Sequence, residues 1–112
     1  MTILIFEDNL LWSARLLKSC KALGHDARIL TKLSEEVAAP AVAIVNLGSH
    51  TIPVEPLVSM LRAKSIGIVA HAGHKEKELH ELGRQLGCDR LATNSELTYK
   101  LEAILEEFSN LA

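Results

Sequence analysis

Short apolar runs alternate along this chain with segments whose apolar residues recur at helical spacing. Three of the runs are continuous and are typical of parallel strands covered on both faces; they span residues 3–6, 42–45 and 66–69. Two weaker β-type segments lie at residues 27–30 and 91–92. The pattern therefore predicts five strands.

Apolar residues recur every three or four positions between these runs, which predicts helices. The helical periods cover residues 10–20, 53–61, 79–86 and 97–108. Gly24 and Gly87 follow two of these periods as C-terminal stops. Thr93 and Glu96 have the spacing of a capping box before the last helix. The stretch 31–39 is poorly patterned, and we interpret it as a short helix or a loop.

Strand alternates with helix about five times, which predicts a parallel sheet with helices on both faces. A length of 112 residues fits one domain, so we expect residues 1–112 to form a single α/β domain, a doubly wound (βα)5 sheet. In such sheets, ligands bind at the carboxyl ends of the strands. Candidate chemistry is therefore sought at the strand ends.

Composition excludes several classes of protein. A net charge of −2 provides no basic footprint for nucleic acid or an anionic membrane. No apolar run approaches the roughly 18 residues of a membrane span, and the acids at positions 7 and 8 do not fit the basic head of a signal peptide. Cys20 and Cys88 are too few for a disulfide framework and are expected in the core or half-buried. We expect a cytoplasmic protein.

The strand ends carry polar residues. The first strand ends on two adjacent carboxylates, Glu7 and Asp8, and such pairs often hold a divalent cation. Local roles stay open, because Asp8 or Asn9 can cap a helix and Asn46 can bind loop backbone. Histidines in polar loops are mostly solvated. The other strand ends are followed by Asn46, Ser49, His50, His71, His74, Thr93 and Asn94.

The segment "ILIFEDNLLWSARLLKSCKALGHDARIL" resembles the opening of the response-regulator receiver domain, the phospho-accepting module of two-component signalling. "PAVAIVNLGS" is similar to the third strand of that family, and "GCDRLATNSEL" to the approach to its last helix. The resemblance covers essentially the whole chain and depends on strand order and spacing. It implies a flavodoxin-like, receiver-like fold and a role in bacterial signal transduction.

The resemblance also implies a site. In that family two acids hold Mg²⁺, an Asp ending the third strand accepts the phosphoryl group, and a Ser or Thr and a Lys end the fourth and fifth strands. Glu7 and Asp8 match the acids. The departures are Asn46 at the acceptor, Ala70 at the hydroxyl residue, and Asn94 (or Thr93) at the lysine.

These departures remove the family's chemistry. A neutral carboxamide is a very poor nucleophile toward phosphorus, so Asn46 cannot form an aspartyl phosphate. Without the lysine, no cation offsets the charge of the transferred group. We therefore expect a pseudo-receiver that is not an enzyme and has no cofactor beyond weak Mg²⁺ at Glu7 and Asp8.

We expect no output domain within the 112 residues of a stand-alone domain, so any output would be another chain, a self-associated dimer, or nothing detectable. Receivers commonly associate through the family's fourth helix, fifth strand and fifth helix. The corresponding residues here are Glu76, His80, Arg84, Arg90, Tyr99 and Lys100.

A metal-binding or hydrolytic site is the alternative function. His50, His71 and His74 all fall in predicted loops at the same edge as Glu7 and Asp8, and imidazole with carboxylate suits Zn²⁺. The spacing matches no compact zinc motif. A flavin or nucleotide site is weaker, because "LGSH" and "HAGH" form neither GxGxxG nor a P-loop.

Overall fold

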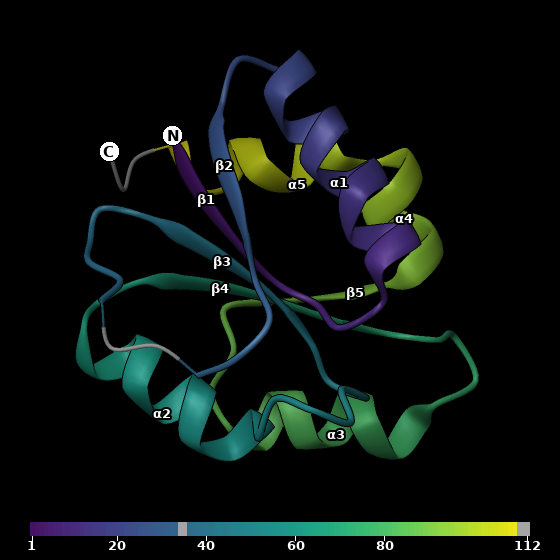
Figure 1. Ribbon diagram of the computed structural model, residues 1–112. Coiled ribbons are helices and arrows are strands. Elements are labelled where there is room, and N and C mark those ends of the chain that lie inside the picture. The colour runs from purple at the N-terminus through teal and green to yellow at the C-terminus, as the bar shows by residue number, and fades with distance from the viewer. Residues whose placement is uncertain (34–35, 110–112) are drawn as a thin grey trace.

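Five parallel strands form one sheet in the computed structural model, which describes residues 1–33 and 36–109. The spatial order is β2-β1-β3-β4-β5, with every neighbouring pair parallel (Figure 1). This order confirms the doubly wound parallel sheet. The strands are β1 (Thr2–Phe6), β2 (Asp26–Leu30), β3 (Val42–Asn46), β4 (Gly67–Ala72) and β5 (Arg90–Thr93).

Helices cover both faces of this sheet (Figure 1). The helices α1, α4 and α5 pack on one face, and α2 and α3 pack on the other. Leu97, Leu101, Leu105 and Phe108 face the sheet, as the last helical period predicts. The bounds are α1 (Leu10–Ala22), α2 (Val54–Ala63), α3 (Lys77–Gln85), α4 (Asn94–Tyr99) and α5 (Leu101–Glu106).

Two connections differ from a full (βα)5 repeat. Between β2 and β3, residues 31–33 and 36–41 contain no helix, and residues 34–35 of the expected helix or loop lie outside the described part. The poor apolar periodicity of this stretch explains the difference, since a helix there would have no face to bury. The last predicted helix is divided at Lys100, whose φ of −124° interrupts the helical backbone between α4 and α5.

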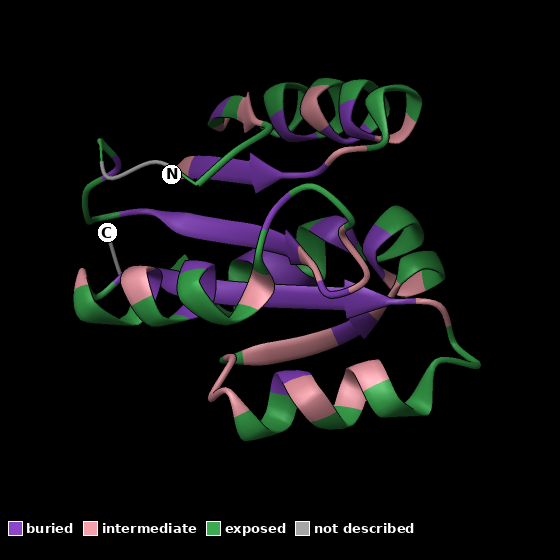
Figure 2. Cartoon of the chain, turned by 60° about the horizontal axis from the view of Figure 1, so that its bottom comes forward, coloured by how far each residue is buried: buried purple, intermediate pink, exposed green. Residues whose placement is uncertain are grey.

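The strands alternate their side chains between two apolar clusters, one on each face of the sheet. Leu4 and Phe6 of β1 join the cluster under α2 and α3, whereas Ile3 and Ile5 join the cluster under α1, α4 and α5. Figure 2 shows β1, β3 and β4 buried and the outer faces of the helices exposed. This double covering is the reason that the strands read as continuous apolar runs.

Polar residues that follow β1, β3 and β4 lie at one edge of the sheet because parallel strands end on the same side. The register pairs Phe6 with Val45 and Asn46 with His71. Glu7, the residue after Phe6, therefore continues the row that contains Asn46 and His71.

No helix in the described part of the chain is long and apolar enough to cross a membrane.

Candidate functional site at the carboxyl edge of the sheet

The site is built on a row of three side chains from adjacent strands, Glu7, Asn46 and His71. The Nδ2 of Asn46 donates a hydrogen bond of 2.7 Å to the Oε2 of Glu7. Glu7 is only 3% exposed. The sequence places Asn46 beside the acidic pair, and this contact confirms that placement.

The carboxylate of Glu7 lies in an unusual environment for a charge. Burial raises its pKa, and this effect outweighs the hydrogen bonds from the Asn46 amide and the Asp8 backbone, which lower it. Among the residues that the structure describes, no lysine or arginine lines the pocket beside it. The protein therefore buries an acid here with amide donors in place of a cation.

Asn46 uses both ends of its amide. Its Oδ1 accepts a hydrogen bond of 2.9 Å from the backbone N–H of Gly48, and its Nδ2 binds Glu7. The local interpretation, in which a strand-end Asn binds loop backbone, is therefore correct. By the receiver resemblance, the same side chain is expected at the position of the phospho-acceptor.

Asp8 is turned toward the loop after β3. Its Oδ2 accepts hydrogen bonds from the backbone N–H groups of His50 and Thr51, at 2.9 and 3.3 Å, and from the Ser49 hydroxyl at 3.2 Å. Burial alone would raise the pKa of Asp8, but these donors lower it below its ordinary value. The helix cap is Asn9, which accepts from the Trp12 N–H at 3.1 Å.

Each of these two carboxylates already uses one oxygen in hydrogen bonds within the protein. Mg²⁺ requires near-octahedral oxygen ligands, yet one oxygen of Glu7 is held by two N–H donors and one oxygen of Asp8 is held by the loop. In the described residues, no group of three or more His, Cys, Asp or Glu side chains is arranged to hold a metal ion.

The fourth strand contributes His71 to the pocket and not Ala70. Side chains alternate along β4, so Ala70 points into the apolar cluster under α2 and α3, whereas His71 points to the other face. The expectation that Ala70 occupies the hydroxyl position is therefore one residue out of register. The strand continues to Ala72, three residues beyond the apolar run 66–69 that set the predicted end.

His71 is buried, with 2% of its surface exposed. Its Nδ1 lies 2.7 Å from the Oδ1 of Asn94, and its ring lies 4.7 Å from the indole of Trp12, tilted by 36°. Burial lowers its pKa to about 4; the Asn94 contact opposes this shift, and His80 adds slightly to it. The imidazole is therefore neutral at pH 7.

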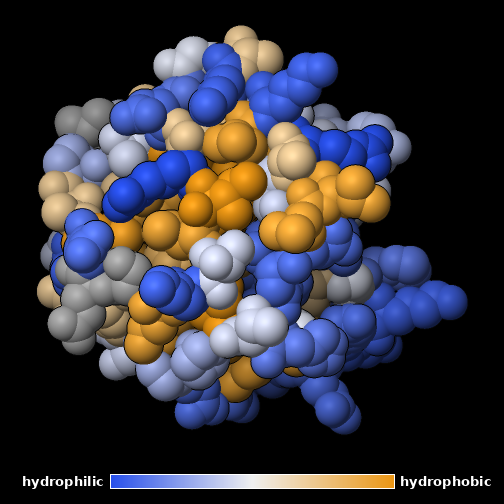
Figure 3. Space-filling view, viewed as in Figure 1, coloured by the Kyte–Doolittle hydropathy of each residue, from blue (hydrophilic) through white to orange (hydrophobic). Residues whose placement is uncertain are grey.

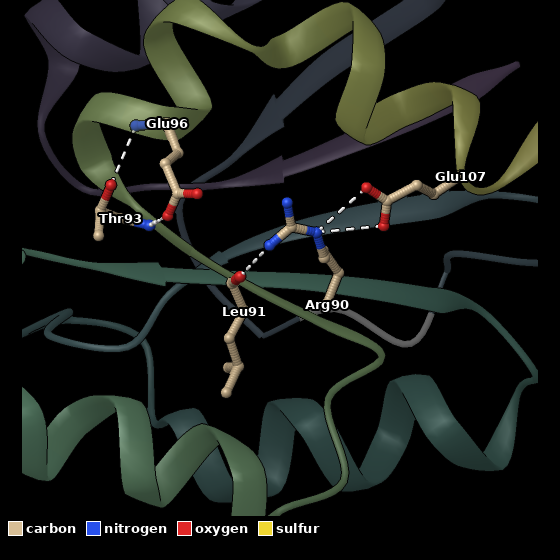
Figure 4. A network of polar contacts seen from close by, with 5 residues as sticks. All are labelled: Arg90, Leu91, Thr93, Glu96 and Glu107. Carbon is tan, nitrogen blue, oxygen red and sulfur yellow. Dashed lines mark hydrogen bonds and ion pairs between the residues drawn. The ribbon is translucent and has the colours of Figure 1, made fainter.

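Asn94 is held at the end of β5 by the predicted capping box. The Thr93 hydroxyl accepts from the Glu96 N–H at 3.0 Å, and the Glu96 carboxylate accepts from the Thr93 N–H at 2.9 Å. Both contacts are drawn in Figure 4. Because Thr93 is used in this cap, Asn94 is the side chain that reaches the pocket.

A pocket of about 180 Å³ lies at this edge. Sequence reasoning did not place Asn9 or Trp12 in it. A sequence signal for Trp12 does exist. In a helix with about 3.6 residues per turn, the third residue after the N-cap comes back to the side of the helix that faces the strand ends. The lining residues are Glu7, Asn9, Trp12, Asn46, His71 and Asn94.

The three histidines of the alternative metal site lie in different surroundings, so this prediction is wrong in its geometry. His71 is buried beneath Trp12, whereas His50 and His74 are exposed in loops. The backbone of His50 binds Asp8, but its side chain joins no cluster of metal ligands in the described part of the chain.

The residues of the expected interaction face differ in solvent exposure and in their pairing with other side chains. Arg84 is exposed and paired with Glu81 on its own helix. Arg90 is tied to Glu107 at 3.1 Å and also donates to the carbonyl of Leu91, as Figure 4 shows. Tyr99 is 83% exposed, and Lys100 is exposed beside it.

Apolar side chains also reach the surface elsewhere. Figure 3 shows hydrophobic residues between hydrophilic ones on the side of the molecule that carries β2 and α1. Leu10 and Leu11, in the first turn of α1, are 70% and 83% exposed.

Comparisons with known proteins give agreement in fold. No family model matches the sequence, and no curated protein matches it. The receiver domain of NtrX from Brucella abortus superposes with a TM-score of 0.81 over 98% of this chain and 99% of that one, at 13% identity. A response regulator receiver domain from Rhodospirillum rubrum has a TM-score of 0.73 over 100% and 95%, at 13% identity.

A longer protein matches as well. NtrX from Brucella abortus in complex with ATP has a TM-score of 0.75 and 15% identity, over 95% of this chain and 27% of that one. Identities this low show the fold alone. With its five-stranded parallel sheet in the order β2-β1-β3-β4-β5, the chain has the fold of response-regulator receiver domains.

Proposed function

We propose that this protein is a pseudo-receiver, a regulatory binding module of signal transduction that is not phosphorylated at the usual position. The observation that carries the proposal is the amide of Asn46, which donates 2.7 Å to Glu7 where the family has a carboxylate acceptor. The lone pair of an amide nitrogen is delocalised into its carbonyl group, so the carboxamide of Asn46 is a very poor nucleophile toward phosphorus.

The neighbours of Asn46 support this proposal. A phosphoryl group carries negative charge, and its transfer is stabilised by cations and hydroxyl or N–H donors aimed at its oxygens. The pocket instead contains the acid Glu7, the neutral His71 and the amide Asn94. In residues 1–33 and 36–109, neither a hydroxyl nor a cationic side chain lines it.

We infer that regulation acts through a protein partner or a second copy, and that the contact surface surrounds the edge strand β5, between α3 and the α4–α5 pair. Arg84, Tyr99 and Lys100 are exposed there. Arg90 serves the fold instead, through its pair with Glu107.

Incubation with acetyl phosphate and Mg²⁺ tests the loss of phosphorylation. The intact mass should stay unchanged, and a conventional receiver domain in the same reaction should gain one phosphoryl group. A stoichiometric gain on an aspartate of this chain would contradict the proposal.

A further inference from the structure

The pocket contains an unpaired hydrogen-bond acceptor. Because Nδ1 of His71 faces the Oδ1 of Asn94 at 2.7 Å, the ring proton lies on Nδ1 and leaves Nε2 as an acceptor. In the described part of the chain, this Nε2 is the buried side-chain nitrogen or oxygen that lacks a partner. A buried acceptor of this kind is stabilised by a hydrogen-bond donor, so Nε2 of His71 is a candidate contact for a ligand with an N–H group.

The charge of the pocket selects the sign of a ligand. Among the described residues that line the pocket, Glu7 is the one with a charged side chain. Its Oε2 accepts from Asp8 and Asn46, whereas its Oε1 accepts no hydrogen bond from the residues that the structure describes. Burial raises the pKa of this carboxyl, as expected for an acid without a counter-ion. An anion would be repelled here, and a cation would be attracted.

The walls favour a flat ligand. The indole of Trp12 packs against the imidazole of His71 with ring centroids 4.7 Å apart. Aromatic faces attract cations, and planar cations stack on them. A pocket of about 180 Å³ holds a ligand of only a few non-hydrogen atoms.

We propose that the pocket binds a small planar organic cation of the amidinium or guanidinium class, whose N–H groups donate to the Glu7 carboxylate and to Nε2 of His71. Trp12 lines the pocket, so a ligand bound there contacts the indole and changes its surroundings. The inference deepens the proposed function, because it assigns an input to the site where phosphorylation is lost. Binding is measured directly and does not depend on a partner.

Trp12 is the single tryptophan of the sequence, so intrinsic fluorescence reports on this pocket. The full chain is titrated with acetamidinium chloride, with acetamide and sodium acetate as neutral and anionic molecules of the same shape. Sodium chloride controls for ionic strength. We expect a saturable change with acetamidinium alone, with a Kd in the millimolar range for so small a ligand.

Two variants test the assigned contact. Glu7→Gln keeps the shape and removes the charge, and it should weaken acetamidinium binding about tenfold or more. Glu55→Gln removes an exposed acid on α2, outside the pocket, and should bind like the parent. If Glu7→Gln does not fold, the ¹⁵N shift of His71 Nε2 in the parent decides, since it must move when Nε2 accepts a hydrogen bond.

The proposal is overturned if acetamidinium does no more than sodium chloride, or if acetamide or magnesium chloride gives an equal response. An unchanged affinity in folded Glu7→Gln also overturns it. Phosphorylation by acetyl phosphate would contradict the proposed function by a separate readout, the intact mass, so failure of one proposal is distinguishable from failure of the other.

Discussion

The Nδ2 of Asn46 lies 2.7 Å from the Oε2 of Glu7, so two neighbouring strands are joined at their ends by an amide and a buried carboxylate. In the receiver pattern, by resemblance, a carboxylate stands at the position of Asn46. Here the amide donates directly to the acid of the neighbouring strand.

Replacing Asn46 by Asp tests this relationship. The variant loses the donor to Glu7 and places two carboxylates at contact distance, where like charges raise one another's pKa and destabilise the fold. We expect a free energy of unfolding lower by about 2 kcal/mol without metal. Added Mg²⁺ should raise the Tm of Asn46→Asp more than that of the parent, by ligand linkage.

Thermal unfolding with and without MgCl₂ measures this difference, and CaCl₂ shows whether the response is specific to Mg²⁺. Phosphorylation of the variant should stay poor, because His71 and Asn94 supply neither hydroxyl nor cation. Equal Mg²⁺ responses in parent and variant would contradict the assigned role of the Asn46–Glu7 pair.

His71 should make stability fall in acid. Its pKa in the folded protein is about 4, below the ordinary value of 6.5, because burial disfavours the charged ring. Between these values the unfolded chain binds a proton that the native state does not. The free energy of unfolding should therefore decrease as the pH falls through this window, by about 3 kcal/mol at most.

Urea unfolding across that window compares the parent with His71→Gln, in which this part of the pH dependence should be lost. His74→Gln is the matched control, since His74 is exposed in a loop, and it should keep the slope of the parent. A parallel pH dependence in all three proteins would argue against a buried neutral His71.

Asp8 should act as the anchor of the loop after β3. Its Oδ2 accepts from the backbone N–H groups of His50 and Thr51, so Asp8→Ala leaves those donors unpaired. We expect a loss of about 1–2 kcal/mol in the free energy of unfolding, and faster amide hydrogen exchange at residues 49–51 than in the parent. Asp26→Ala, at the exposed start of β2, is the control. Unchanged exchange in the loop would show that Asp8 does not hold it.

Charge reversals separate the proposed contact surface from the fold. Arg84 and Lys100 are exposed, so Arg84→Glu with Lys100→Glu should weaken association while leaving the Tm nearly unchanged. Arg90→Glu removes the half-exposed pair with Glu107 and should lower the free energy of unfolding by about 1 kcal/mol or less. Light scattering and a pull-down measure association. Association that is unaffected by the double reversal would place the contact elsewhere.

The fold follows largely from the sequence, because burial on both faces of a parallel sheet leaves a local record. The apolar runs at β1, β3 and β4, the glycine stops and the Thr93–Glu96 capping box each depend on neighbouring residues in the chain. The poor apolar periodicity after β2 left a short helix or a loop open for this connection, and the described residues there form no helix.

The row of Glu7 and Asn46 could likewise be predicted, because strand ends in a parallel sheet meet at one edge. Only the tertiary structure decided the register of β4, since a shift of one residue exchanges the two faces of a strand and places His71, not Ala70, in the pocket. Only it decided that Asp8 holds a loop while Trp12 covers His71, because these contacts join side chains whose directions depend on packing between distant segments.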